Sequence, residues 1–300
     1  MEMHSLIRGC AVAAAFGIVA PASAQERPGD KDSSEIVVKG MRDQKREISD
    51  FVGALTDAPI GGQLSRFEEP ACPAAVGLSP AQNKTVASRM RSVAAAAGAP
   101  LGKQDCSPNV LVVVTDDKQA VIAQLEKKYT NALGDRVKAP KQSGPAAVWH
   151  LEGVLDANGV PVGVAVDTGD DPGGHYVVEM GDGASRIRPA SRPHFLASVL
   201  VVEPDAIAGL TTTQLADYAT VRLLARTDPS RLGKSAAPTI LNILDAPMGS
   251  TVPVTLTHWD FGFLKALYRS GEGRYANQQR KEMQGLLRKE LEKAQGREKN

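Results

Sequence analysis

Residues 109–114 read Asn-Val-Leu-Val-Val-Val, a continuous apolar and β-branched run that constrains the fold more than any other feature of the chain. Such a run predicts a strand buried on both faces, because a strand with one face in water alternates apolar and polar residues. Strands of this kind belong to sheets that helices cover on both sides. We therefore expect helices close to this strand in the sequence.

Helices are predicted both before and after this strand. Before it, Ser79 and Gln82 form a capping box around a proline at the first helical position, and Gly98 marks the helix end. After it, the Thr-Asp-Asp of residues 115–117 caps a second helix, with its carboxylates at the positive end of the dipole. With a short strand expected at residues 64–67, the segment predicts a β-α-β-α unit with a parallel strand pair.

The middle of the chain predicts an antiparallel meander. Residues 146–203 alternate apolar and polar side chains with a two-residue period. Asn158-Gly159 and Asp182-Gly183 separate successive runs, and these dipeptides favour tight hairpin turns. We expect the meander to join the first strands in one mixed sheet.

The last part of the chain is predicted to be helical. Thr211 with Gln214, and Thr257 with Asp260, repeat the capping-box pattern between apolar residues at the staple positions. A final helix is expected at about residues 274–294, where an apolar stripe runs along an otherwise basic sequence. This helix packs on its own protein or, as the alternative, lies on an anionic surface.

Together these elements predict an α+β (mixed α/β) fold, in which a mixed sheet is flanked by helices. We expect a single main domain over residues 46–300, preceded by a flexible, polar tail at residues 25–45 and closed by a C-terminal helix. The domain divides into a β-α-β-α half, a β-meander and a helical end, at residues 46–140, 146–203 and 204–300.

The first residues predict a signal peptide. A short segment that ends in Arg8 precedes an apolar stretch at residues 9–20, and Ala22-Ser23-Ala24 supplies a small-x-small cleavage pattern. The alternative is a membrane anchor, but this apolar stretch is shorter than the ~20 residues of a membrane span. Residues 1–24 are therefore interpreted as a Sec-type signal, and the protein as periplasmic or secreted, with no transmembrane segment after cleavage.

The cysteines predict a disulfide bond. Cys10 lies in the signal segment, which leaves Cys72 and Cys106 as an even pair in an exported protein. A redox-active or metal-binding pair is the alternative, but redox pairs normally have Cys-x-x-Cys spacing. A disulfide between residues this far apart would stabilise the fold by roughly 3 to 4 kcal/mol on the chain-entropy model.

Composition argues against nucleic acid as a partner. The chain has 35 Lys plus Arg against 34 Asp plus Glu, so it lacks the bulk positive charge that phosphate contacts require. Aromatic residues make up only 4% of the chain, which disfavours sites that stack sugars or bases on aromatic rings.

Motifs for catalysis or metal binding are weak. One Asp-Thr-Gly begins at Asp167, whereas an aspartic protease needs two copies, from one chain or a symmetric dimer. Asp167, Asp170, Asp171 and His175 could alternatively hold a cation, although the spacing differs from that of a calcium loop. No Gly-x-Ser-x-Gly, Ser-x-x-Lys, P-loop or dinucleotide motif occurs in the sequence. We expect neither a metal nor a cofactor.

One segment of the tail resembles a partner-binding motif. Glu35, Ile36, Val37 and Val38 are similar to the box that follows the signal peptide in TonB-dependent outer-membrane receptors. The resemblance implies that an extended tail adds as a strand to an envelope protein. A β-branched tail segment without a partner is the alternative.

Residues 67–72, 89–98, 106–109 and 214–219 are similar to an uncharacterised family of secreted alphaproteobacterial proteins. Residues 238–245, 256–260 and 264–268 are similar to the tail of families with a zincin-like layout. Together these resemblances cover most of the chain that follows the predicted signal peptide. In the zincin-like families, the helix at residues 215–224 would carry a His-Glu-x-x-His metal site. Here this helix has no His.

Two functions follow as expectations. The first is a non-catalytic exported protein that binds a partner or ligand at the cell envelope, because no reactive centre is recognisable. The alternative is a diverged hydrolase of zincin-like architecture with a rebuilt polar site. The residues expected to form that site are Asp217, Tyr218, Arg222, His258 and Asp260.

Overall fold

The computed structural model describes residues 30–56, 62–133, 144–162, 165–167, 175–177, 188–233, 235, 237–247 and 249–298. The chain divides into two compact units, Met1–Arg42 and Asp43–Asn300. The described residues of the first unit form the start of helix α1 (Asp30–Leu55). The remaining elements belong to the second unit.

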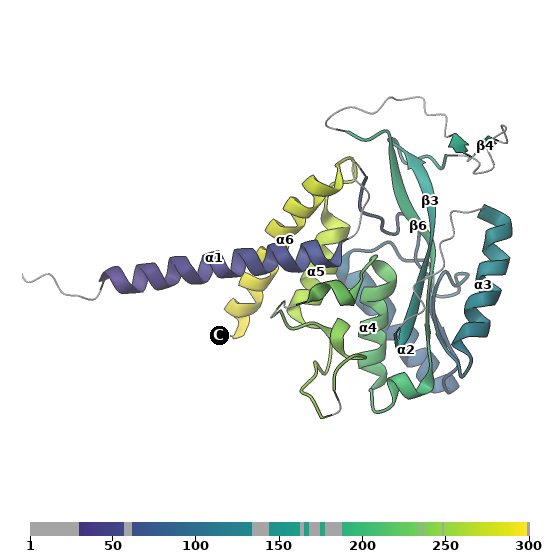
Figure 1. Ribbon diagram of the computed structural model, residues 1–300, viewed down its shortest axis with the longest axis horizontal. Helices are drawn as coiled ribbons and strands as arrows, with labels where there is room; N and C mark the ends of the chain where they lie inside the picture. The colour runs from purple at the N-terminus through teal and green to yellow at the C-terminus, as the bar shows by residue number, and fades with distance from the viewer. Residues whose placement is uncertain are drawn as a thin grey trace, which may run out of the picture. The chain divides into compact units, whose positions relative to one another are not determined.

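A four-stranded mixed sheet forms the centre of the second unit, with the strand order β1-β2-β6-β3 (Figure 1). The strand β2 runs parallel to β1 on one side and to β6 on the other, whereas β3 pairs antiparallel with β6. The predicted mixed sheet is therefore confirmed, although the strand that pairs with β2 is β1 and not the one expected at residues 64–67. The strand bounds are Pro73–Val76 for β1, Val110–Val114 for β2, Ala146–Asp156 for β3 and Ser191–Val202 for β6.

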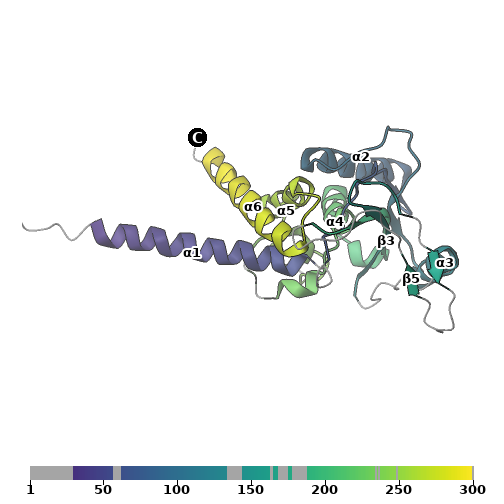
Figure 2. The ribbon, with the colours of Figure 1, turned by 90° about the horizontal axis from the view of Figure 1, so that it is seen from above.

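The β2 strand is covered on both faces, as its apolar run predicts. Alternate side chains starting at Val110 join the main core with helices α2 (Pro80–Ala97) and α4 (Thr212–Leu224). Those starting at Leu111 join a smaller apolar cluster with residues of α3 (Lys118–Leu133). Figure 2 shows α3 on the side of the sheet opposite α2 and α4.

The predicted helix caps are present in the structure. The Ser79 hydroxyl accepts from the Gln82 N–H at the start of α2, and Gly98 adopts φ 89° at its end. Thr211 with Gln214 caps α4 in the same way, and the third box begins α5 (His258–Arg269). Short 3₁₀ helices lie at Pro204–Ile207, Pro229–Leu232 and Ile240–Asn242.

The last helix, α6 (Ala276–Glu298), packs on α5 through a buried stripe of Met283, Leu287 and Leu291. Gly262 makes this packing close, because a Cβ at that position would lie 2.6 Å from the Leu287 Cδ1. The predicted amphipathic helix therefore packs on its own protein.

The first strand differs from the prediction. Residues 64–67 form a single bridge, between Arg66 and His194, and β1 lies further along the chain. The N–H of Leu64 donates to the Gln279 side chain, and the N–H of Phe67 donates to the Tyr268 hydroxyl. These main-chain donors are therefore satisfied by side chains rather than by a strand.

The predicted meander is also only partly correct. The Asn158-Gly159 turn is present, with the Asp156 carboxylate accepting from the N–H groups of Asn158 and Val160. The strands β4 (Ala165–Asp167) and β5 (His175–Val177), however, pair with each other in a separate two-stranded sheet. The second predicted turn, Asp182-Gly183, lies outside the described residues.

The N-terminal tail was expected to be flexible over residues 25–45, but the chain is helical from Asp30 onward. This part of the chain mixes good helix formers such as Glu and Lys with weaker ones such as Asp, Ser and Val, so its local sequence did not indicate the helix. Residues 35–38 lie within α1, so strand addition there would require this part of the helix to unfold.

The predicted disulfide is present. The Sγ atoms of Cys72 and Cys106 lie 2.04 Å apart, and the bond joins the start of β1 to the segment before β2. Within the described parts of the chain, no helix combines the length and the apolar character needed to cross a membrane.

Candidate functional site

Asp217, on α4, is fully buried and joins three parts of the fold. Arg89 of α2 donates to it from Nε at 2.7 Å and from Nη2 at 3.0 Å. The Thr255 hydroxyl and the Leu256 N–H each donate to Oδ2 at 2.7 Å. The hydrogen bonds to Asp217 raise the pKa of the Arg89 guanidinium. Asp217 therefore fastens the segment before α5 to α4 and α2.

Asp260 is a second buried anchor, at the start of α5. Its carboxylate accepts from the hydroxyl and the N–H of Thr257, from the Thr239 hydroxyl at 2.5 Å and from the Ile240 N–H at 2.9 Å. Burial raises the pKa of Asp260 and outweighs these hydrogen bonds, which lower it. The side chain links the cap of α5 to the 3₁₀ helix that begins at Ile240.

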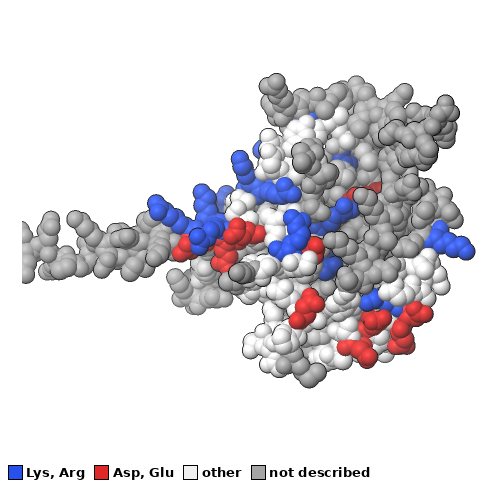
Figure 3. Space-filling model, viewed as in Figure 1, with Lys and Arg blue, Asp and Glu red and all other residues white. Residues whose placement is uncertain are grey.

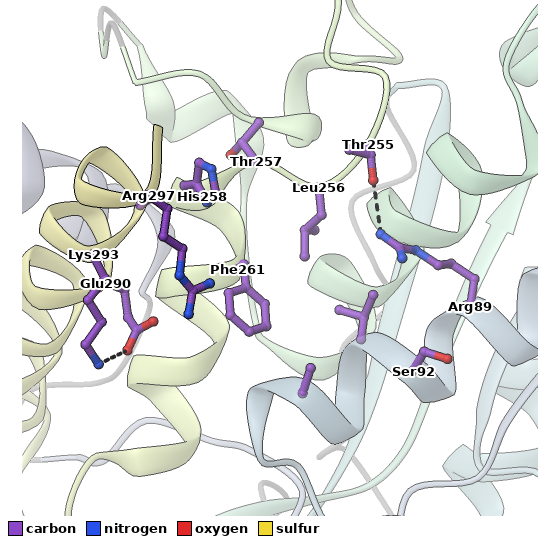
Figure 4. A pocket seen from close by; sticks show the side chains of 13 residues that line it. Arg89, Ser92, Thr255, Leu256, Thr257, His258, Phe261, Glu290, Lys293 and Arg297 are labelled. Carbon is purple, nitrogen blue, oxygen red and sulfur yellow. Dashed lines mark hydrogen bonds and ion pairs between the residues drawn. The ribbon is translucent and has the colours of Figure 1, made fainter. Parts of the chain in front are cut away.

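A groove of about 390 Å³ lies between α2, α5, α6 and the segment before α5; we call it the helix groove. Its floor is apolar, with Val93 and Ala96 from α2, Leu256 and Phe261. Figure 4 shows Leu256 and Phe261 between Arg89 on one side and Arg297 on the other. The lining residues are Arg89, Ser92, Val93, Ala96, Thr255, Leu256, Thr257, His258, Phe261, Glu290, Lys293, Ala294 and Arg297.

The rim of the helix groove carries an excess of positive charge. Arg89 is neutralised by Asp217, but Glu290 is shared between Lys293, at 3.4 Å, and Lys265, at 2.9 Å. Arg297 is exposed and has no ion-pair partner among the residues that the structure describes. Of the three Lys and Arg residues that line the groove, Asp217 and Glu290 balance two, so the rim has an excess of one positive charge.

A second cavity, of about 310 Å³, lies where the end of α4 meets the start of β3. We call it the polar pocket, because its side chains are mainly hydrogen-bonding groups. Its polar side chains are those of Tyr218, Arg222, Thr227, Asp228, Ser230 and Asp245. The Arg222 Nη1 donates to the Tyr218 hydroxyl at 3.2 Å.

The five residues expected to form one polar site are divided between separate places. Tyr218 and Arg222 line the polar pocket, and His258 lines the helix groove. Asp217 and Asp260 are buried and engaged in the hydrogen bonds described above. A general acid or base must reach its substrate, whereas both carboxylates already accept four hydrogen bonds from the protein.

The described residues contain no group of three or more His, Cys, Asp and Glu side chains arranged to hold a metal ion. The cation site considered at Asp167, Asp170, Asp171 and His175 falls largely outside this description. The Asp167 and His175 backbones pair between β4 and β5, and Asp170 and Asp171 lie outside the described residues.

Sequence patterns missed several of the residues that shape the two cavities. Arg89 and Asp217 are 128 residues apart, and neither shows a motif that marks the other as its partner. Lys293 and Arg297 belong to a helix that is basic along its length, so only its packing on α5 places these two at a groove. Thr227 lies in a connecting segment without a recognisable pattern, and Asp245 lies in a segment that shows a family resemblance but no motif for a binding site.

The described surface shows no continuous basic area on the face drawn in Figure 3. Lys and Arg side chains lie near Asp and Glu side chains there, in agreement with a formal net charge of +1. Positive charge is instead local, as at the rim of the helix groove.

No family model, no curated protein and no solved structure matches the chain significantly. The helix groove and the polar pocket are therefore the basis for the function proposed below.

Proposed function

We propose that the protein is an exported, non-catalytic binding protein whose helix groove takes an amphipathic anion. Such a molecule has an apolar tail and one acidic head group, as a medium-chain fatty acid does. The observation that carries the proposal is an apolar floor beneath a rim with uncompensated positive charge.

The apolar floor favours a ligand with a hydrocarbon tail. Val93, Ala96, Leu256 and Phe261 offer carbon surface without charged groups, and burying a ligand's apolar surface there is favourable. A volume of about 390 Å³ falls within the range of small-molecule sites. The groove is therefore large enough to hold one short hydrocarbon tail.

The rim favours an acidic head group. Arg297 presents a guanidinium that can bind a carboxylate by two hydrogen bonds, and Lys293 lies one turn before it on α6. A cationic head group would be repelled at the same place. Charge complementarity thus selects an anion over a neutral or cationic amphiphile.

Export is part of the proposal. The signal-type sequence at residues 1–24 and the Cys72–Cys106 disulfide support it, because disulfides persist in oxidising compartments outside the cytosol. A ligand-binding role without catalysis is supported by the two buried carboxylates, which are engaged as structural anchors.

Calorimetric titration with laurate tests this function. We expect laurate to bind below its micelle concentration, and dodecyltrimethylammonium, with a similar tail and the opposite charge, to bind at least tenfold more weakly. The variant Lys293→Gln/Arg297→Gln should weaken laurate binding by about tenfold, because solvent-facing ion pairs each contribute up to about 1 kcal/mol.

The control is Lys289→Gln/Arg288→Gln, which removes the same charge from α6 at residues outside the groove lining. Laurate affinity should be unchanged in this variant. Equal binding of both amphiphiles, or an equal loss of affinity in the control, would overturn the proposal.

A further inference from the structure

The polar pocket contains two buried polar atoms that have no hydrogen-bond partner. They are the Thr227 hydroxyl oxygen and the Arg222 Nε, both on side chains that line the cavity. Thr227 is only 8% exposed. Buried polar groups in folded proteins nearly always have partners, because an unpaired one retains its full desolvation cost. Two such atoms at one cavity indicate that something else satisfies them.

Charges of opposite sign also line this pocket without pairing. The Arg222 guanidinium contacts the Tyr218 hydroxyl, and it forms no ion pair within the described part of the chain. The Asp245 carboxylate likewise has no hydrogen-bond or ion-pair partner among the described residues. By contrast, Asp228 is occupied, since its carboxylate accepts from the N–H and the hydroxyl of Ser230.

Arg222 and Asp245 both affect the pKa of the Tyr218 phenol. Burial is the main reason that its pKa is raised; Arg222 lowers the pKa and Asp245 raises it. Both charged groups therefore act on the same phenol, although they do not contact each other. The pocket holds a cation and an anion apart across a space of about 310 Å³.

The charges limit what the pocket can bind. A simple anion would find Arg222 but would face the carboxylates of Asp228 and Asp245. A simple cation would find these carboxylates but would leave the Arg222 Nε unpaired. A molecule with a carboxylate at one end and an ammonium at the other satisfies both, and the Thr227 hydroxyl can donate to the same carboxylate.

We infer that the polar pocket binds a small zwitterion of the α-amino acid type, with its carboxylate on Arg222 and Thr227 and its ammonium on Asp245. The ligand enters as a free molecule and no bond is made or broken. This site is separate from the helix groove, since the two cavities share no lining residue.

The test is calorimetric titration of the full chain with each of the twenty common L-amino acids. We expect at least one to bind with a stoichiometry of one. For that amino acid, the amide and the N-acetyl derivative should each bind at least tenfold more weakly, because each lacks one of the two charges. Failure of all twenty to bind would overturn the inference, and so would equal binding of either derivative.

Variants then locate the binding. Arg222→Gln and Asp245→Asn should each weaken the affinity by about tenfold or more, as expected when a charge-assisted hydrogen bond is lost. The controls Arg269→Gln and Asp205→Asn remove the same charges from exposed residues outside the pocket lining and should bind normally. Equal losses in the controls would overturn the assignment.

Thr227→Val separates a binding defect from a folding defect. Its hydroxyl has no partner in the ligand-free protein, so replacement by a side chain of the same shape should not lower the melting temperature. Amino-acid binding should nevertheless weaken several-fold. An unchanged affinity would contradict a role for Thr227.

The inference can fail independently of the proposed function. Lys293→Gln/Arg297→Gln should retain amino-acid binding, and Arg222→Gln should retain laurate binding. If both ligands respond to the same variants, the two sites are not distinct and this inference is wrong.

Discussion

At the scale of single side chains, Asp217 and Asp260 serve as structural anchors. Both were candidates for a polar site, and Asp260 was also predicted as a capping residue. In the structure each is fully buried and accepts four hydrogen bonds from neighbouring segments. A buried carboxylate is stable only when such donors surround it. Both residues therefore act as anchors that position the helix groove.

His150 predicts a dependence of stability on pH. The imidazole ring of His150 stacks on the ring of Phe195, and the two ring centroids are 4.4 Å apart. His150 lies on β3, and this strand contacts α4. Burial, and then the cations Arg226 and Arg222, lower the pKa of His150 from 6.5 to about 3. Between these values the unfolded chain binds more protons than the folded one. The free energy of unfolding should therefore fall as the pH falls from 6.5 towards 3, by up to about 1.4 kcal/mol per pH unit.

Urea denaturation at pH 7, 6, 5 and 4 measures this slope. His150→Gln should reduce the slope relative to the unchanged protein. Burial also raises the pKa of Asp260, which acts in the opposite direction, because that contribution to stability is lost as the pH rises through the folded-state value. Asp260 is present in both proteins, so the difference between slopes isolates His150. Identical slopes would refute the assignment.

At the scale of elements, Gly77 controls how the ends of β1 and β2 approach each other. It adopts φ 92°, and a Cβ at this position would lie 1.8 Å from the Val114 carbonyl oxygen. We expect Gly77→Ala to destabilise the fold by more than about 3 kcal/mol, because backbone strain and a main-chain clash add together.

Gly98 is the matched control for this prediction. It adopts φ 89° at the end of α2, but no atom lies within 4 Å of the position of its Cβ. Gly98→Ala should therefore cost only about 1 to 2 kcal/mol, the strain of a left-handed backbone. Chemical denaturation of both variants measures the difference. Equal costs would show that the clash with β2 is relieved.

The disulfide acts at the scale of the whole molecule, since it closes a loop that contains β1 and α2. Cys72 and Cys106 are 34 residues apart. Replacing both by Ala should lower the free energy of unfolding by up to about 4 kcal/mol, because the unfolded chain regains the entropy that the cross-link removes. Denaturation of the oxidised protein, the reduced protein and the double variant measures this. The reduced protein should match the variant; an unchanged stability would contradict the prediction.

The sequence predicted the helices better than the sheet. Capping boxes at Ser79, Thr211 and Thr257 are complete within a few residues, so they could be identified without the rest of the fold. The choice of the first strand was wrong, because side chains of Gln279 and Tyr268 take the donors of residues 64–67. Those partners come from more than 200 positions later in the chain.

The candidate site was less predictable than the fold. Asp217, Tyr218, Arg222, His258 and Asp260 were grouped by residue type and by their helices. Tertiary packing separated them, because side chains on different sides of a helix face different neighbours. Tyr218 and Arg222, one turn apart on α4, remained together.

The sequence by itself determined the capped starts of α2, α4 and α5, the strand that is buried on both faces, the turn at Asn158-Gly159 and the cysteine pair. Each of these depends on local geometry or on a property that neighbouring residues share. Only the tertiary structure decided which strands pair beside β2, that Arg89 meets Asp217, and where the two cavities lie. Such contacts join residues far apart in sequence, and neither partner carries a local signal of the other.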